Sequence, residues 1–322
     1  MALLAGCNSP QPTASETTTT TKLQCPVPPI VDGKFTPEVM WAMGRLTGYA
    51  PSADGKLLAY TVTRYDVKEN KGWSDLFLKN LADGTIKQLT DFNAQVYNIE
   101  WRGNDKLLFA SSHEGTPQIY SIITDGTALP RLSDVETGID GFRVSPDGAQ
   151  IAYISTIPII PQVKDNYPDL DKSTGKVYDD LMYRHWDVWD DGSRSHVFVA
   201  SFANEKVGNG KDLLEGEPYH SPLRPFGGIE EIGWSADGTL LAYTSKKLTG
   251  KASAFSTDSD IYLYNLATNE TRNLTEGNLG YDRCPVFSPD GKYIVYTSME
   301  RGGFEADHER LMLYDLAANT KR

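Results

Sequence analysis

The chain has 322 residues, of which 39% are hydrophobic and 11% aromatic, and its formal net charge at pH 7 is −12. This length allows a sizeable hydrophobic core. The acidic residues are dispersed and no basic patch of the kind that binds nucleic acid is visible, so the charge is best explained by solubility and no nucleic-acid partner is expected. No apolar run reaches the length of about 18 residues that a membrane-spanning helix needs.

The first residues resemble a lipidation signal. The stretch LLAGC, from Leu3 to Cys7, is similar to the bacterial lipobox, in which small residues precede a cysteine that is cleaved at and lipidated. The polar segment NSPQPTASETTTTTK, from Asn8, has the composition of a flexible tether. We predict a disordered tail over 1–30, lipidation at Cys7 as the one link to a membrane, and a periplasm-facing place in the bacterial cell envelope. Too few residues precede Cys7 for a signal peptide, so we expect a late start or a fragment; a chance match is the alternative.

A short helix is predicted after the tail. Thr36 is a favourable N-cap, Pro37 suits the first helical position, and Glu38 favours the positive end of the helix. This pattern predicts a helix that runs to Arg45.

The stretch FSPDGKYIVYTS, from Phe287 to Ser298, predicts a β-hairpin. Pro289 presets the backbone for a type I turn, Asp290 tolerates the next position, and Gly291 can take the left-handed conformation that closes the hairpin with a bulge. The β-branched and aromatic residues that follow suit a buried strand.

Four other stretches repeat this hairpin. They are PSADGKLLAYTV from Pro51, VSPDGAQIAYIS from Val144, WSADGTLLAYTS from Trp234 and a degenerate copy with a rewritten turn, WRGNDKLLFASS from Trp101. The spacing is near the period of about 45 residues of a four-stranded repeat, except that one repeat carries an insertion of about 40 residues.

Each copy is followed by a strand, a polar turn and a short strand, as in SDLFLKNLADGTIKQLT from Ser74, PQIYSIITDGTALPRLS from Pro117 and SDIYLYNLATNETRNLT from Ser259. Four antiparallel strands with this period are the blade of a β-propeller. We therefore predict an all-β fold, a partial β-propeller over 31–322. Its blades are expected near 46–95, 96–138, 139–228, 229–280 and 281–322, with an insertion over 158–194. The last blade is expected to be incomplete and the ring truncated, because an open ring leaves a blade face uncovered.

The insertion contains DDLMYRHWDVWDDGSRSH, from Asp179, which is dense in aromatic and charged residues. Loops on a rigid scaffold often carry binding residues, so Arg184, Asp187 and Asp190 are candidate substrate-binding residues. The tryptophans Trp186 and Trp189 are more simply interpreted as a small satellite core that fixes the insertion to its blade.

The usual catalytic motifs are absent from the sequence. It has no G-x-S-x-G, H-E-x-x-H or C-x-x-C, and its five histidines lack metal-ligand spacing, so no catalytic residue, metal site or cofactor is expected. The pair Glu230-Glu231 could bind an ammonium group, but such pairs are more often solvated. Cys25 and Cys284 could pair in an oxidising envelope, although two unpaired thiols are the simpler interpretation.

Two longer stretches carry a family resemblance. LMYRHWDVWDDGSRSHVFV, from Leu181, and SPDGKYIVYTSMERGGFEADHERLMLYDL, from Ser288, resemble the N-terminal propeller of the prolyl oligopeptidase family of serine peptidases. Within the family, the dipeptidyl-peptidase 5 and acylaminoacyl-peptidase branch is most similar. The SPDG hairpin is shared by many bacterial propellers, whereas the insertion and MERGGFEAD are more specific.

This resemblance implies a two-domain enzyme in which a propeller of seven or eight blades caps an α/β-hydrolase domain that holds a Ser-Asp-His triad. In this sequence we expect about five blades and no hydrolase domain, so no triad residue can be transferred and the chain alone is expected to be inactive. The implied role is a propeller that limits access to short peptides and pairs with the missing hydrolase domain. The alternative is a non-catalytic periplasmic propeller for protein binding, resembling that of the Tol system.

Overall fold

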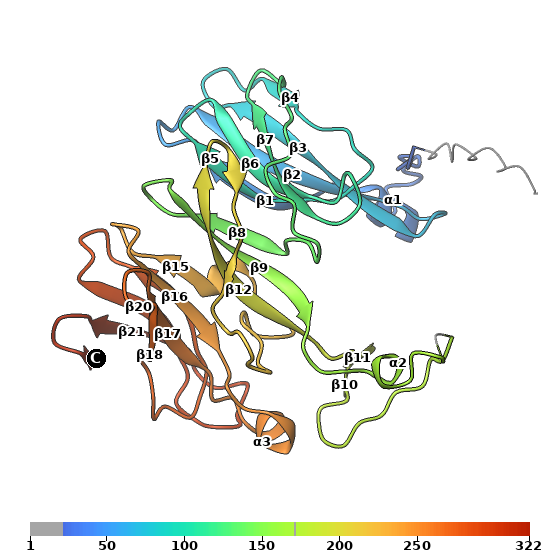
Figure 1. Cartoon of the computed structure of the whole chain (residues 1–322). Helices are drawn as coiled ribbons and strands as arrows, with labels where there is room; N and C mark the ends of the chain where they lie inside the picture. The colour runs from blue at the N-terminus through green and yellow to red at the C-terminus, as the bar shows by residue number, and fades with distance from the viewer. Residues whose placement is uncertain (1–21, 171) are drawn as a thin grey trace, which may run out of the picture.

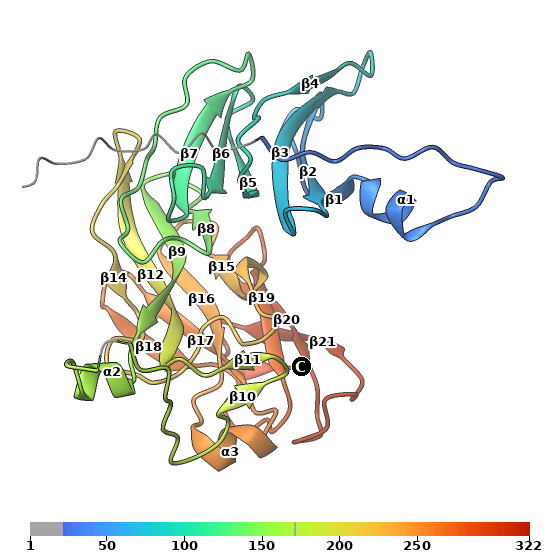
Figure 2. The ribbon, with the colours of Figure 1, turned by 90° about the vertical axis from the view of Figure 1, so that its right-hand side faces the viewer.

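The structure is a computed structural model that describes residues 22–170 and 172–322, so the expected lipidation site Cys7 lies outside the described residues. Five larger antiparallel sheets, the blades, follow one another around an arc from the blue N-terminal sheet to the red C-terminal sheet (Figure 1 and Figure 2). The predicted all-β fold of four-stranded antiparallel blades is confirmed. In the described part of the chain, no helix is long and apolar enough to cross a membrane.

The blades use the strands in chain order. Blade 1 contains β1 (Arg45–Pro51), β2 (Leu57–Asp66), β3 (Lys71–Asn80) and β4 (Ile86–Gln88), and blade 2 contains β5 (Val96–Arg102), β6 (Lys106–Ser111) and β7 (Gln118–Ile123). Blade 3 contains β8 (Gly141–Val144), β9 (Gln150–Pro158), β12 (Ser193–Ala203), β13 (Lys206–Val207) and β14 (Lys211–Asp212). Blade 4 contains β15 (Ile232–Trp234), β16 (Leu240–Ser245), β17 (Asp260–Asn265) and β18 (Glu270–Asn273), and blade 5 contains β19 (Asp282–Phe287), β20 (Tyr293–Ser298), β21 (Arg310–Asp315) and β22 (Thr320–Lys321).

Shorter elements lie outside the blades. They are α1 (Pro37–Ala42) before blade 1, α2 (Val163–Asn166) and the hairpin β10 (Arg184–His185) and β11 (Val188–Trp189) in the insertion of blade 3, the 3-10 turn Ile229–Glu231, and α3 (Gly250–Phe255).

The turn between the first two strands is built in the same way in four blades. Its serine hydroxyl donates to the aspartate two residues later over 2.5 to 2.7 Å and accepts the N–H at the start of the second strand at 2.9 Å. The closing glycine has a φ between +69° and +75°, the left-handed conformation predicted from the sequence. These turns span 52–55, 145–148, 235–238 and 288–291.

Neighbouring blades are joined by repeated contacts. Trp101 Nε1 donates to the carbonyl of Ala50 at 2.9 Å, and Trp234 Nε1 donates to the carbonyl of Arg143 at 2.9 Å. In both cases the first strand of one blade holds the first strand of the blade before it. Four buried apolar clusters lie between successive sheets, because a blade buries its faces only against its neighbours. No strand pairing joins blade 1 to blade 5 among the described residues, so the arc is open.

The predicted N-terminal helix is present but shorter than expected. Thr36 caps α1, and its Oγ1 accepts the N–H of Val39 at 3.4 Å. The helix ends at Ala42 instead of Arg45, because Arg45 already pairs with Thr63 as the first residue of β1.

The prediction of a fourth strand in blade 2 is wrong. Only an isolated bridge between Tyr120 and Arg131 remains there. Pro130 precedes the bridge, and a proline has no N–H to donate to a strand ladder.

The two ends of the blades differ in their connections. The regular turns lie at one end, which we call the turn face. The loops between second and third strands lie at the other end, which we call the loop face; in blades 3 to 5 these are 159–192, 246–259 and 299–309. Figure 2 shows α3 beside the β10–β11 hairpin at the loop face.

Candidate functional site

The insertion leaves blade 3 at the end of β9 and returns at the start of β12. Its two ends are fixed together, because the N–H groups of Ile159 and Ile160 donate to the carbonyl of Gly192 at 3.1 and 2.9 Å. Gly192 is required here, since its φ is +79° and a Cβ would lie 2.2 Å from the carbonyl oxygen of Ile160. The insertion therefore projects from a closed neck.

The candidate residues Arg184 and Asp187 lie on the β10–β11 hairpin, and both are exposed. Arg184 Nε donates to the carbonyl of Trp186 at 2.6 Å, and its guanidinium lies 5.3 Å from the ring centroid of Trp189. Neither residue forms an ion pair among the described residues. The hairpin thus presents one positive and one negative group to solvent.

The third candidate, Asp190, is engaged within the protein. Its two carboxylate oxygens accept from Arg194 Nη1 and Nη2 at 3.0 and 3.1 Å, and one also accepts the N–H of Gly192 at 2.8 Å. Burial raises the pKa of Asp190, but the hydrogen bonds from Arg194 and Gly192 outweigh it and hold the pKa below its ordinary value. Asp190 lies beside Arg184 in the hairpin, because its N–H donates to the carbonyl of Tyr183 at 3.0 Å, but its carboxylate pairs with Arg194 and fixes the neck of the insertion.

The two tryptophans make different contacts. Trp189 stacks with Tyr178 and Tyr183 at centroid distances of 6.1 and 6.2 Å, within the insertion. Trp186 lies 5.3 Å from the ring of Phe226, which belongs to the connection between blades 3 and 4. Trp186 and Phe226 are 65% and 72% exposed, so this contact also leaves an apolar surface open on the loop face.

A polar cluster that lies beside this contact was not predicted from the sequence. Arg224 Nε donates to Ser195 Oγ at 3.0 Å and Nη2 donates to Thr156 Oγ1 at 3.1 Å. The N–H of Ser195 donates to Nδ1 of His220 at 3.2 Å. Burial lowers the pKa of His220 to about 3, and the charges of Arg194 and Arg224 act in the same direction, so its imidazole is neutral at physiological pH.

The acidic pair Glu230-Glu231 is not the solvated pair that the sequence indicated. Glu230 is exposed, but Glu231 is fully buried, and its Oε1 lies 2.6 Å from Arg283 Nη2. Its Oε2 accepts the N–H of Leu223 at 2.7 Å. Burial raises the pKa of Glu231, and the hydrogen bonds from Leu223 and Arg283 oppose this shift. Glu231 therefore joins blades 4 and 5 and is not available to bind an ammonium group.

The two cysteines in the described residues do not pair with each other. Cys25 lies near the carbonyls of Trp41 and Ala42, whereas Cys284 is in the first strand of blade 5 with a φ of +55°. Within the described chain, no group of three or more His, Cys, Asp or Glu side chains could hold a metal ion.

Comparisons with known proteins identify sequences that are similar to this chain. The chain is 44% identical over 288 residues to dipeptidyl-peptidase 5 of Porphyromonas gingivalis, a match that covers 89% of this chain and 42% of that protein. It is 27% identical over 313 residues to dipeptidyl-peptidase 5 of Aspergillus fumigatus, covering 88% of this chain and 43% of that protein. No family model matches the chain.

A solved structure agrees in fold. The uncomplexed acylaminoacyl peptidase of Pyrococcus horikoshii has a TM-score of 0.61, with 16% sequence identity over 86% of this chain and 39% of that chain. The chain is thus similar over most of its length to proteins named dipeptidyl-peptidase 5, and the likeness to the solved structure is one of fold. It spans about 42% of the length of the dipeptidyl-peptidase 5 of Porphyromonas gingivalis.

In this chain, the loops of blades 3 to 5 are connected to one another on the loop face. The carboxylate of Asp180, in the insertion, accepts the N–H of Lys251 at 3.2 Å at the start of α3. The Oγ1 of Thr257, after α3, accepts the N–H of Gly303 at 2.9 Å. Three loops from three blades thus form one continuous rim, which we call the loop rim.

The last loop of the rim is the MERGGFEAD segment. Asp307 organises it: one carboxylate oxygen accepts the N–H groups of Glu300 and Arg301 at 3.0 and 2.8 Å, and the other accepts from Arg301 Nε at 2.8 Å. The Arg301 guanidinium lies 4.1 Å from the ring centroid of Phe304. The hydrogen bonds from Arg301 hold the pKa of Asp307 far below its ordinary value.

Proposed function

We propose that this chain is the substrate-gating propeller of a bacterial envelope serine exopeptidase of the dipeptidyl-peptidase or acylaminoacyl-peptidase type. The observation that carries the proposal is the 44% identity to dipeptidyl-peptidase 5 of Porphyromonas gingivalis over 89% of the chain. In such an enzyme, a peptide bond is cleaved by acyl transfer in a separate hydrolase domain, with the oxyanion stabilised there. The chain alone is then inactive, and its partners are short peptides and that hydrolase domain.

The loop rim supports a gating role. Because Asp180 and Thr257 connect the loops of three blades, a bulky substrate cannot displace one loop without disturbing the others. Rigid loops on a fixed scaffold restrict what passes between them. The rim is therefore proposed to admit short peptides and to exclude longer ones.

The charged residues of the insertion are proposed to act beside the rim. Arg184 and Asp187 are available to meet the charged end of a peptide, because both are exposed and neither is paired with an opposite charge in the described chain. Asp190 is proposed to act indirectly, by fixing the neck through Arg194.

The gating proposal is tested in the peptidase that contains this chain. Replacing Asp180 with alanine removes the acceptor of the Lys251 N–H at the start of α3, and Asp179→Ala, one residue away and exposed, is the matched control. We expect Asp180→Ala to raise kcat/KM for a long peptide relative to a dipeptidyl reporter substrate, whereas Asp179→Ala should leave the ratio unchanged. An unchanged ratio would show that the rim does not gate.

The isolated chain provides a second test. We expect the purified 322-residue chain to give no hydrolysis of dipeptidyl reporter substrates, and turnover would contradict the assignment of the chemistry to another domain. If the containing gene product also lacks peptidase activity, the alternative of a non-catalytic propeller for protein binding is favoured.

Attachment to the envelope is proposed through Cys7. Replacing Cys7 with serine should release the protein from the membrane fraction and abolish labelling by a radioactive fatty acid. Cys25→Ser is the matched control, and it should leave both unchanged. Persistence of the label in Cys7→Ser would disprove lipidation at this residue.

A further inference from the structure

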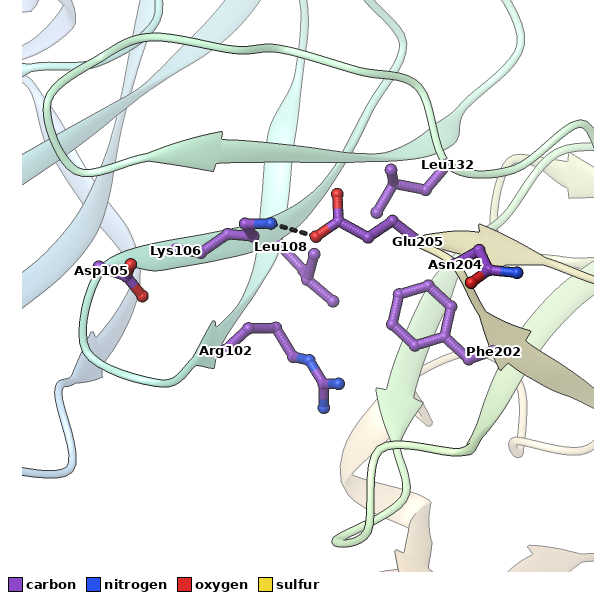
Figure 3. A pocket seen from close by; sticks show the side chains of 8 residues that line it. All are labelled: Arg102, Asp105, Lys106, Leu108, Leu132, Phe202, Asn204 and Glu205. Atoms are coloured by element: carbon purple, nitrogen blue, oxygen red, sulfur yellow. Dashed lines mark hydrogen bonds and ion pairs between the residues drawn. The ribbon is translucent and has the colours of Figure 1, made fainter.

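A pocket of about 440 Å³ opens on the turn face between blades 2 and 3. Figure 3 shows Arg102 and Lys106 reaching across it from blade 2 and Phe202 and Glu205 from blade 3. Buried side chains of Leu108, Leu132 and Phe202 form its apolar wall. Pockets that bind small ligands commonly have volumes of about 300 to 1,000 Å³. Five of the eight residues that line this pocket are polar or charged.

Arg102 marks a departure from the internal repeat. It takes the place of the serine that organises the other four turns, where the hydroxyl donates to the turn aspartate. In the turn of blade 2, Arg102, Asn104 and Asp105 occupy the positions of the serine, the aspartate and the glycine of the regular turns. The side chain at this position is thus released from the turn and extends toward blade 3.

The Arg102 guanidinium is charged without an ion-pair partner among the described residues. It lies 5.6 Å from the ring centroid of Phe202. Gly148 leaves room for it, because a Cβ at Gly148 would lie 2.5 Å from both Nη1 and Nη2. Asp105 also lines the pocket, but it forms no ion pair with Arg102 among the described residues.

The other basic residue of the pocket is neutralised. In two regular turns the equivalent lysine pairs with the aspartate of its own turn, at 3.2 Å for Lys56 and 3.4 Å for Lys292. Lys106 instead forms an ion pair with Glu205 of blade 3. Glu205 has a φ of +58°, a left-handed conformation that favours glycine, so an acidic side chain is kept there at a cost in backbone strain. The Lys106–Glu205 pair closes one side of the pocket and leaves Arg102 as its unpaired positive charge, with the Asp105 carboxylate also in the lining.

We propose that this pocket binds a small organic carboxylate that carries an apolar group. The carboxylate would accept from the guanidinium of Arg102, which favours planar, two-point recognition of this anion. The apolar group would lie against Phe202, Leu108 and Leu132. The pocket is on the turn face, away from the loop rim, so this site is independent of the proposed peptidase role.

The test uses the intact 322-residue chain and a pair of probes that differ in charge. N-acetylphenylalanine carries a carboxylate and an aromatic ring, whereas its amide has the same ring and no charge. Titration calorimetry should show saturable binding of the acid, with a Kd of about 1 mM or tighter, and binding of the amide that is about tenfold weaker or more. Equal affinity for acid and amide, or no saturable binding of the acid at about 10 mM, would overturn the proposal.

Variants locate the binding at Arg102. Arg102→Ser restores the residue of the regular turns, so it should still fold cooperatively and should lose at least tenfold in affinity for the acid. Arg64→Gln is the matched control, because Arg64 also lies over a ring, 5.7 Å from the centroid of Phe77, but far from the pocket in blade 1. It should bind the acid as the wild type does. Wild-type affinity in a folded Arg102→Ser chain would place the probe elsewhere and reject the site.

Discussion

Glu231 and Arg283 form an ion pair across the boundary between blades 4 and 5. The Glu231 carboxylate is fully buried, and its Oε1 lies 2.6 Å from Nη2 of Arg283, which is 23% exposed. Removing one partner of a buried pair leaves an uncompensated charge, which is usually more costly than the pair is stabilising.

We therefore expect Glu231→Ala to lower the free energy of unfolding by about 3 kcal/mol, the lower end of the range for buried pairs, because Arg283 retains some contact with water. Urea denaturation of the purified chain measures this change. Glu230→Ala, at the exposed neighbouring position, should change stability by no more than about 0.5 kcal/mol. Equal losses in the two variants would show that the pair does not hold the blades together.

Ser74 holds the boundary between blades 1 and 2 in a different way. Its Oγ donates to the carbonyl of Val96 at 2.8 Å and accepts the N–H of Val96 at 2.6 Å, and the residue is buried. Ser74→Ala leaves both backbone groups unpaired, so we expect a loss of about 2 kcal/mol in the free energy of unfolding. Ser112→Ala, whose hydroxyl makes only a 3.4 Å contact with the N–H of Gln95, should lose much less. A Ser74→Ala chain as stable as the wild type would contradict this role.

The elements that depended on local chemistry could be predicted from the sequence. The turn at 288–291 follows from the preferences of its own four residues, and the cap of α1 follows from Thr36. Such features need no knowledge of distant partners. The end of α1 could not be predicted, because pairing of Arg45 with Thr63 decides it.

The candidate site was less predictable because its partners are distant in sequence. The burial of Glu231 depends on Arg283, and the position of Arg224 depends on Thr156 and Ser195. No spacing rule connects such residues. Arg102 is different: its replacement of the repeated serine is visible in the aligned turns, and that signal could have identified the pocket.

Glu100 gives the stability of the chain a pH dependence. Burial raises its pKa from 4.5 to about 7, against the opposing effects of the Val144 N–H and the charges of Arg143 and Arg102. Between these two values the folded state keeps a proton that the unfolded chain has released. The free energy of unfolding contributed by Glu100 is therefore complete below about pH 4.5 and falls as the pH rises to about 7.

Glu100→Gln should remove the fall in the free energy of unfolding between about pH 4.5 and pH 7. We expect the variant to match the wild type at pH 4 and to exceed its free energy of unfolding at pH 8 by on the order of 2 kcal/mol. Denaturation curves across this pH range measure the difference, with exposed Glu136→Gln as the control that should follow the wild type. A constant difference at all pH values would show that Glu100 does not titrate in this window.

Substitutions of the glycine that closes each regular turn can separate the cost of backbone strain from the cost of steric contact. Gly291 has a φ of +69° and open space where a Cβ would stand, so Gly291→Ala should cost about 1 kcal/mol through strain alone. Gly291→Asn should cost less, because asparagine enters the left-handed region more readily. Gly148→Ala should cost about the same as Gly291→Ala, because the Arg102 guanidinium that its new Cβ would meet is the movable end of a long side chain. Urea denaturation of the three variants tests this order. A larger loss of stability in Gly148→Ala than in Gly291→Ala would show that the Arg102 side chain cannot move away.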